Sequence, residues 1–224
     1  MTAALLFDLD GTLIDSDGAH LRAFQRVFAA RGIALDKKTY DKRIQGAENA
    51  AIGRDFLPHL SAAEQAATLA AKEARYRDDL GEVEPIAGVE AMLDFAAARG
   101  LKCALVTNAP RANIEKVLGA LGLAKRLTQW VVGAELARAK PDPLPYQTAL
   151  ARLGAEAGRS VAFEDSPSGL RSAKGAGLMV VGLTTTMPAD KLLAAGAEIA
   201  VADFTDPRIR PLIEARVAAP GTKT

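Results

Sequence analysis

Strand-like and helix-like segments alternate over most of the chain after Pro85, and this alternation constrains the fold more than any other feature. Short apolar runs are separated by amphipathic stretches, and such alternation implies parallel strands with helices packed on the sheet. The pattern predicts a doubly wound parallel α/β fold with helices on both faces. The expected strands are 102–106, 130–132, 160–163, 179–182 and 199–201, and the expected helices are 89–99, 112–121, 143–153, 168–176, 189–195 and 207–217.

One further strand is expected at residues 3–7, and it has no strand-like neighbour before Pro85. An isolated strand would leave its backbone N–H and C=O groups unpaired, so we expect it to join the later strands. The stretch between them is rich in Ala, Arg and Glu, and Ser61 followed by Glu64 predicts a capped helix start within it. The domain interpretation is therefore a Rossmann-like α/β core of residues 1–14 and 85–224, with residues 15–84 inserted as a cap domain of roughly four helices.

Composition and charge limit what the chain can bind. Lys and Arg number 28 against 27 Asp and Glu, a net charge of +1, which gives no overall field for nucleic acid or an anionic membrane. The single cysteine excludes an intrachain disulfide and a cysteine zinc site. No signal-peptide pattern or membrane-length apolar run is evident. We expect a cytoplasmic protein, a monomer or weak homo-oligomer, whose partner is a small molecule rather than nucleic acid or a membrane.

Polar clusters follow the predicted strands or lie in the loops after them. Because parallel strands bring their carboxyl ends to one edge of the sheet, where open α/β sheets bind ligands, we expect the clusters to converge. They are Asp8 with Asp10, Thr107 with Asn108, Lys140 with Pro141, and Glu164 with Asp165 and Ser166.

This set of side chains suits phosphoryl transfer. Several carboxylates at one point repel each other, and a hard cation with oxygen ligands, Mg²⁺ rather than zinc, relieves that repulsion. Lys140 adds positive charge, and Thr107 and Asn108 add neutral donors for a phosphate dianion. With its charge neutralised, phosphorus can be attacked by an aspartate. Asp8 ends the strand and is the expected nucleophile, whereas Asp10 in the turn is the expected acid and base.

Four segments, in order, resemble the motifs of the haloacid dehalogenase superfamily, in particular its group with a helical cap after the first motif. They are residues 7–12, 106–108, 140–143, and 163–166 with Gly169. The resemblance implies that Asp8 is the nucleophile, that Asp10 is the acid and base, and that Thr107 and Lys140 hold the phosphoryl group. It also implies Mg²⁺ bound by Asp8, the Asp10 backbone carbonyl and Asp165, with Glu164 in direct or water-mediated contact.

Two enzyme activities fit this group, and hydrolysis is favoured. Asp10 argues against dehalogenation, because dehalogenase relatives lack the second acid. Residues 46–49 depart from the mutase pattern, and Thr12 after Gly11 resembles the phosphatases. The interpretation is a phosphomonoester hydrolase for a small sugar or polyol phosphate, with a β-phosphoglucomutase-like isomerase as the alternative.

A non-enzyme alternative is a signalling acceptor phosphorylated on Asp8, although a large cap would cover its signalling face. Within the cap, His20 and Lys72 are the candidates for substrate contact. The plainer interpretation of both is a solvated face of a helix, which is the usual place for charged side chains.

Overall fold

The computed structural model describes residues 2–81 and 83–218. The chain divides into two compact units. The first, here called the α/β unit, comprises Met1–Asp15 and Glu84–Thr224, and the second, the helical unit, comprises Ser16–Val83.

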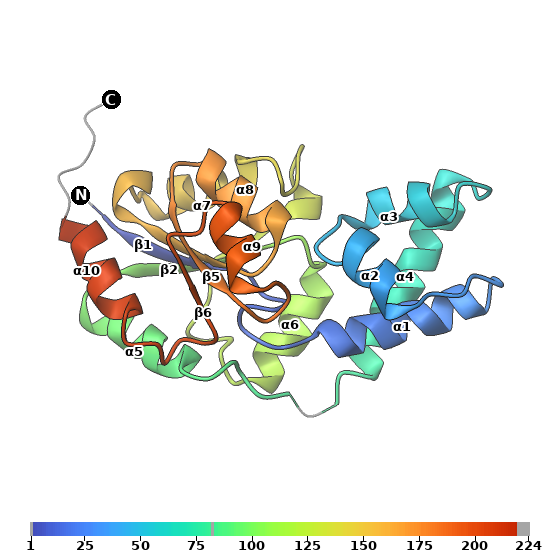
Figure 1. The fold of residues 1–224 in the computed structure, drawn as a ribbon, viewed down its shortest axis with the longest axis horizontal. Helices are drawn as coiled ribbons and strands as arrows, with labels where there is room; N and C mark the ends of the chain where they lie inside the picture. The colour runs from blue at the N-terminus through green and yellow to red at the C-terminus, as the bar shows by residue number, and fades with distance from the viewer. Residues whose placement is uncertain (1, 82, 219–224) are drawn as a thin grey trace. The chain divides into compact units, whose positions relative to one another are not determined.

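The α/β unit contains a six-stranded sheet in the order β3-β2-β1-β4-β5-β6, and every neighbouring pair is parallel (Figure 1). The predicted doubly wound parallel sheet is confirmed. The N-terminal strand β1 pairs with β2 on one side and β4 on the other, which satisfies its backbone as expected. The strands are β1 Ala4–Phe7, β2 Lys102–Thr107, β3 Trp130–Val132, β4 Val161–Glu164, β5 Met179–Leu183 and β6 Ile199–Val201.

Helices cover both faces of this sheet (Figure 1). Ala4 and Leu6 of β1 share a buried cluster with residues of α7, α8 and α9. Phe7 points to the other face, where its ring stacks on Phe163 with centroids 5.0 Å apart. Alternate residues of the central strand are therefore buried on opposite sides, as a fully covered parallel sheet requires. The helices are α5 Val89–Ala98, α6 Arg111–Ala120, α7 Leu144–Leu153, α8 Pro167–Gly175, α9 Ala189–Ala194 and α10 Ile209–Ala218.

The last helix begins later than the sequence pattern predicts. Its expected start was residue 207, but the Asp206 carboxylate accepts a hydrogen bond from the Arg208 backbone N–H at 2.9 Å. Such an Asx turn competes with helical hydrogen bonding, so α10 starts only at Ile209.

The described residues of the helical unit form four helices, namely α1 Asp17–Ala29, α2 Lys37–Arg43, α3 Asn49–Phe56 and α4 Ala62–Asp78. Their apolar faces meet in a cluster that includes Phe24, Phe28 and Leu69. The Ser61 hydroxyl and the Glu64 side chain form the reciprocal capping box that the sequence predicts for α4. Among the described residues, no helix has both the length and the apolar content to cross a membrane.

Candidate active site

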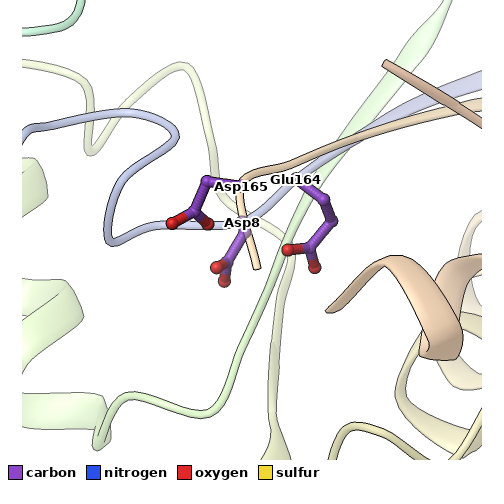
Figure 2. A group of neighbouring side chains, drawn as sticks. All are labelled: Asp8, Glu164 and Asp165. Atoms are coloured by element: carbon purple, nitrogen blue, oxygen red, sulfur yellow. The ribbon is translucent and has the colours of Figure 1, made fainter. Parts of the chain in front are cut away.

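The carboxyl ends of three neighbouring strands bring the site together. Asp8 directly follows β1, and its backbone N–H donates to the Phe163 carbonyl of β4 at 3.1 Å. Thr107 is the last residue of β2, and Glu164 is the last residue of β4. Figure 2 shows the side chains of Asp8, Glu164 and Asp165 leaving the ends of two adjacent strands. The structure therefore gathers these predicted site residues at one edge of the sheet.

Lys140 reaches this edge from the loop between β3 and α7, and it is only 4% exposed. Its ammonium donates to Asp8 Oδ1 at 2.9 Å, to Glu164 Oε1 at 2.6 Å and to the Val106 carbonyl at 2.7 Å. An ammonium has three N–H donors, so these acceptors satisfy it fully. Burial opposes its charge, but Asp8 and Glu164 outweigh burial and raise the pKa of Lys140. The side chain is therefore a fixed positive charge beside Asp8.

Three buried carboxylates share this single ammonium. Oxygens of Asp8, Glu164 and Asp165 all lie within 4.8 Å of one another. Burial raises the pKa of Asp8 despite Lys140, and burial likewise raises the pKa of Glu164 to about 7. The pKa of Asp165 is raised well above its ordinary value by burial and then by repulsion from Asp8 and Glu164. The cluster thus carries more negative charge than Lys140 can balance.

This excess charge and its donor atoms fit a hard divalent cation. The three side chains offer only carboxylate oxygens, the donors that Mg²⁺ prefers over the nitrogen and sulfur donors typical of zinc. A cation here would lower the repulsion that raises the pKa values of these groups. Asp10 lies in the turn after β1, where it forms an isolated bridge with Ile14, and its carboxylate is outside the group of three.

Gly11 follows Asp10 in the turn after β1, and its lack of a side chain lets the Asp165 carboxylate pack closely against this turn. Its φ of 71° lies in the left-handed region, and a Cβ on this residue would come 2.1 Å from Asp165 Oδ2. A larger residue would therefore strain the backbone and displace the carboxylate.

Two threonines after β5 tie the same loops together, and the sequence analysis missed them. Thr186 Oγ1 donates to the Asp165 carbonyl at 2.7 Å, and Thr185 Oγ1 donates to the Gly11 carbonyl at 2.5 Å. Both follow a parallel strand at the same edge as the other clusters, so the criterion applied to those clusters would have found them.

The two predicted phosphate donors after β2 make different contacts. Thr107 Oγ1 accepts from the Ala109 backbone N–H at 3.0 Å, which leaves its own O–H available as a donor. The oxygen and the nitrogen of the Asn108 side-chain amide both contact the Lys140 backbone. Oδ1 accepts from the Lys140 N–H and Nδ2 donates to the Lys140 carbonyl, each at 3.2 Å. Gly133 leaves the space for this contact, because a Cβ there would lie 2.3 Å from Asn108 Oδ1. The Asn108 side chain thus holds the Lys140 backbone in place.

Glu164 has partners that the sequence did not indicate. The Tyr146 hydroxyl donates to Glu164 Oε1 at 2.6 Å. Burial and the Glu164 charge raise the pKa of Tyr146 well above its ordinary value, so the hydroxyl keeps its proton and acts as a donor. In the sequence Tyr146 has the spacing of an ordinary core residue of α7, which is why it escaped notice.

His20 and Lys72, the two candidates for substrate contact, meet within the helical unit. Lys72 Nζ lies 2.8 Å from His20 Nδ1 and 3.0 Å from Glu73 Oε1. Lys72 is only 2% exposed, so its interpretation as a solvated side chain is wrong. His20 is half-buried and stacks on Tyr76, with ring centroids 3.8 Å apart. A charged ion-pair partner next in sequence makes this burial tolerable for Lys72.

Comparison with known proteins gives a consistent set of similarities. The family described as haloacid dehalogenase-like hydrolase matches residues 5–183. The validoxylamine A 7'-phosphate phosphatase of Streptomyces hygroscopicus subsp. limoneus is 33% identical over 211 residues, covering 93% of this chain and 97% of that protein. The phosphoglycolate phosphatase of Rhodospirillum rubrum is 32% identical over 213 residues, covering 91% and 88%.

Among solved structures, a mutant of CbbY from Rhodobacter sphaeroides in complex with xylulose-(1,5)-bisphosphate is similar to this chain. It has a TM-score of 0.81 and 30% sequence identity, and the match covers 92% of this chain and 96% of that one.

Proposed function

We propose that this chain, which belongs to the haloacid dehalogenase-like hydrolase family and is one of its phosphatases, hydrolyses the phosphate monoester of a small metabolite through an aspartyl phosphate on Asp8. The observation that carries this proposal is the contact of Lys140 Nζ with Asp8 Oδ1 at 2.9 Å inside a buried cluster of carboxylates. The substrate class we propose is a sugar or polyol phosphate, which the complex of the similar CbbY protein with xylulose-(1,5)-bisphosphate supports.

Asp8 is suited to the nucleophile's role because its position is fixed at several points. Its backbone is held by β4 and its Oδ1 by Lys140. In the proposed reaction the other oxygen, Oδ2, forms a bond to phosphorus as the bond from phosphorus to the leaving oxygen breaks. Asp10 donates a proton to that leaving oxygen. It then takes a proton from the water that attacks the aspartyl phosphate, which releases inorganic phosphate and restores both carboxyl groups.

The proposed phosphate contacts come from β2 and from the loop before α7. Thr107 has a hydroxyl proton to donate, and Lys140 supplies positive charge next to the reacting carboxylate. The proposed role of Asn108 is limited to its backbone and to holding Lys140, because its amide is engaged by the Lys140 backbone. Mg²⁺ would be held by Asp8, Asp165 and the Asp10 carbonyl, with Glu164 nearby, and would neutralise the phosphoryl oxygens when bound.

Turnover distinguishes this function from its alternatives. The protein with Mg²⁺ should release many equivalents of phosphate from members of a panel of sugar, polyol and nucleoside monophosphates. A mutase would instead return an isomeric sugar phosphate, and a signalling acceptor would give a single stoichiometric burst.

Asp8→Asn tests the nucleophile directly. The substitution keeps the shape of the side chain but removes the anionic oxygen, so phosphate release from a generic aryl phosphate should fall by roughly 10³-fold or more. Asp190→Asn, at an exposed position of α9, is the matched control and should keep full activity. Substantial turnover by Asp8→Asn would remove Asp8 from the mechanism.

A further inference from the structure

A buried tyrosine hydroxyl is directed at the carboxylate that holds Lys140. Tyr146 lies on α7 with 0% exposure, and its hydroxyl is 2.6 Å from Glu164 Oε1. The same oxygen accepts from Lys140 Nζ at 2.6 Å, and the ammonium lies 5.2 Å from the centre of the tyrosine ring. A phenylalanine would fill nearly the same volume, so the hydroxyl is the feature that needs an explanation.

The other side of the Glu164 carboxylate is defined by a glycine. A Cβ on Gly169 of α8 would come 1.8 Å from Glu164 Oε2 and 2.2 Å from Oε1. Among the described residues, Oε2 is buried without a hydrogen-bond partner. The carboxylate thus lies between Gly169 on one side and, on the other side, the Tyr146 and Lys140 donors that both contact Oε1.

The Glu164 carboxylate has two available roles, which are to bind a cation together with Asp8 and Asp165 or to hold the Lys140 ammonium. The carboxylate lies near enough to Asp8 and Asp165 to share a cation with them. In the structure, however, the two donors to Glu164 are the Lys140 ammonium and the Tyr146 hydroxyl, and both contact Oε1. A hydrogen bond to an ionised oxygen is about twice as strong as a neutral one, so the tyrosine hydroxyl adds substantially to this orientation.

We propose that Tyr146 is a positioning residue, whose hydroxyl keeps Glu164 on Lys140 so that Glu164 fixes the ammonium against Asp8 instead of ligating the metal directly. The contacts form a chain from α7 to the nucleophile: the Tyr146 hydroxyl, Glu164 Oε1, Lys140 Nζ and Asp8 Oδ1. This inference rests on the proposed function, because it assigns a role in the same site.

Tyr146→Phe removes only the hydroxyl. With one donor lost, Glu164 holds Lys140 less rigidly, so kcat should fall about tenfold and inorganic phosphate should bind about tenfold more weakly. The dissociation constant of Mg²⁺ measured by calorimetry should stay within about twofold of the original value, because the metal does not depend on Glu164. If the hydroxyl only helped packing, Tyr146→Phe would lower stability without weakening phosphate binding selectively over Mg²⁺ binding.

Three further variants complete the test. Glu164→Gln should reproduce the losses in kcat and phosphate affinity, and for both quantities the double variant with Tyr146→Phe should be no worse than Glu164→Gln alone, since both act through one contact. Gly169→Ala displaces the carboxylate from its other side and gives an independent variant if Tyr146→Phe does not fold. Tyr40→Phe, a buried tyrosine of α2, controls for loss of a buried hydroxyl elsewhere.

Several results would overturn the inference. They are a Tyr146→Phe protein with unchanged phosphate affinity, a Mg²⁺ affinity that falls together with phosphate affinity, and losses that add in full in the double variant. Absence of turnover by the original protein would contradict the proposed function instead. The Mg²⁺ and phosphate titrations need no turnover, so they decide the role of Tyr146 in either case.

Discussion

Each unit of this chain buries a lysine, and the two lysines have different surroundings. Lys72 of the helical unit is paired with Glu73, the next residue in sequence, and lies 4.2 Å from the centre of the Phe24 ring. Lys140 of the α/β unit is paired with Asp8, directly after β1, and with Glu164, at the end of β4. One lysine is matched by a local acid, whereas the other sits among more carboxylates than it can neutralise.

The contacts of Lys72 connect helices. It joins His20 of α1 to α4, and Glu73 accepts from Asn49 Nδ2 of α3 at 2.9 Å. Such a network connects three helices of the helical unit. The cluster around Lys140 instead brings like charges together, which costs stability unless a ligand compensates for it. A surplus of buried charge is therefore a better sign of a reactive site than a buried charge alone.

Removing each lysine charge gives the sharpest contrast. Lys140→Met should reduce turnover by roughly 10³-fold, because Asp8 loses its fixed partner and the phosphate loses a cation. Lys72→Met should lower the free energy of unfolding by about 3 kcal/mol, because it takes the ammonium away from the buried Glu73 carboxylate, while kcat changes less than about tenfold. Steady-state kinetics and urea unfolding measure both quantities.

Abolished turnover with unchanged stability in Lys72→Met would contradict the assignment of Lys72 to helix packing and of Lys140 to the reactive site. A rise in KM for Lys72→Met, with kcat retained, would support its candidacy as a substrate contact together with His20.

Mg²⁺ should stabilise the α/β unit through the carboxylate cluster. At 100 times its dissociation constant the ion should add about 2.7 kcal/mol to the free energy of unfolding. Asp165→Asn should remove most of this gain, whereas Glu73→Gln in the helical unit should keep it. Thermal unfolding with and without Mg²⁺ measures the effect, and an equal gain for Asp165→Asn would exclude Asp165 as a ligand.

The metal-free protein should become less stable as the pH rises from 5 to 8. The Glu164 carboxyl has an ordinary pKa of 4.5 and a pKa of about 7 in the folded protein. Its contribution to the free energy of unfolding is therefore complete below pH 4.5 and is lost as the pH rises through 7. The raised pKa values of Asp8 and Asp165 act in the same direction. Saturating Mg²⁺ should flatten or reverse this trend, because the ion favours the ionised carboxylates.

Urea midpoints measured across this pH range test the sign. Glu164→Gln should weaken the dependence, and a metal-free protein that gains stability between pH 5 and 8 would contradict the account of the cluster.

Asn108→Ala should have the smallest effect. It removes both contacts to the Lys140 backbone and should lower kcat about tenfold, with a loss of stability near 1 kcal/mol. The measurement is again steady-state kinetics with urea unfolding. An unchanged kcat would show that Lys140 keeps its place without this clamp.

Much of the fold was predictable because buried parallel strands leave a clear signal. Their apolar runs located all six strands, and the polar residues after them located Asp8, Lys140, Glu164 and Asp165. The same rule would have found Thr185 and Thr186, had it been applied to the end of β5.

Other features depend on contacts that no local pattern records. Asn108 has the composition of a phosphate donor, yet its amide binds a backbone that lies 32 residues away in the chain. Tyr146 has helical core spacing, so its hydroxyl contact is invisible until α7 packs on the sheet and brings the hydroxyl to Glu164. Lys72 was expected in solvent because most lysines are exposed, and only the packing of α1 against α4 buries it.

The central claim is that Asp8 carries the phosphoryl group during turnover. Acid quenching of the protein in the steady state with Mg²⁺ and a labelled phosphate monoester, followed by mass spectrometry of its peptides, tests this most directly. We predict a phosphoryl group on the peptide that contains Asp8, and none in the Asp8→Asn protein. Sustained phosphate release with no phosphorylated peptide, or with the label on another residue, would contradict it.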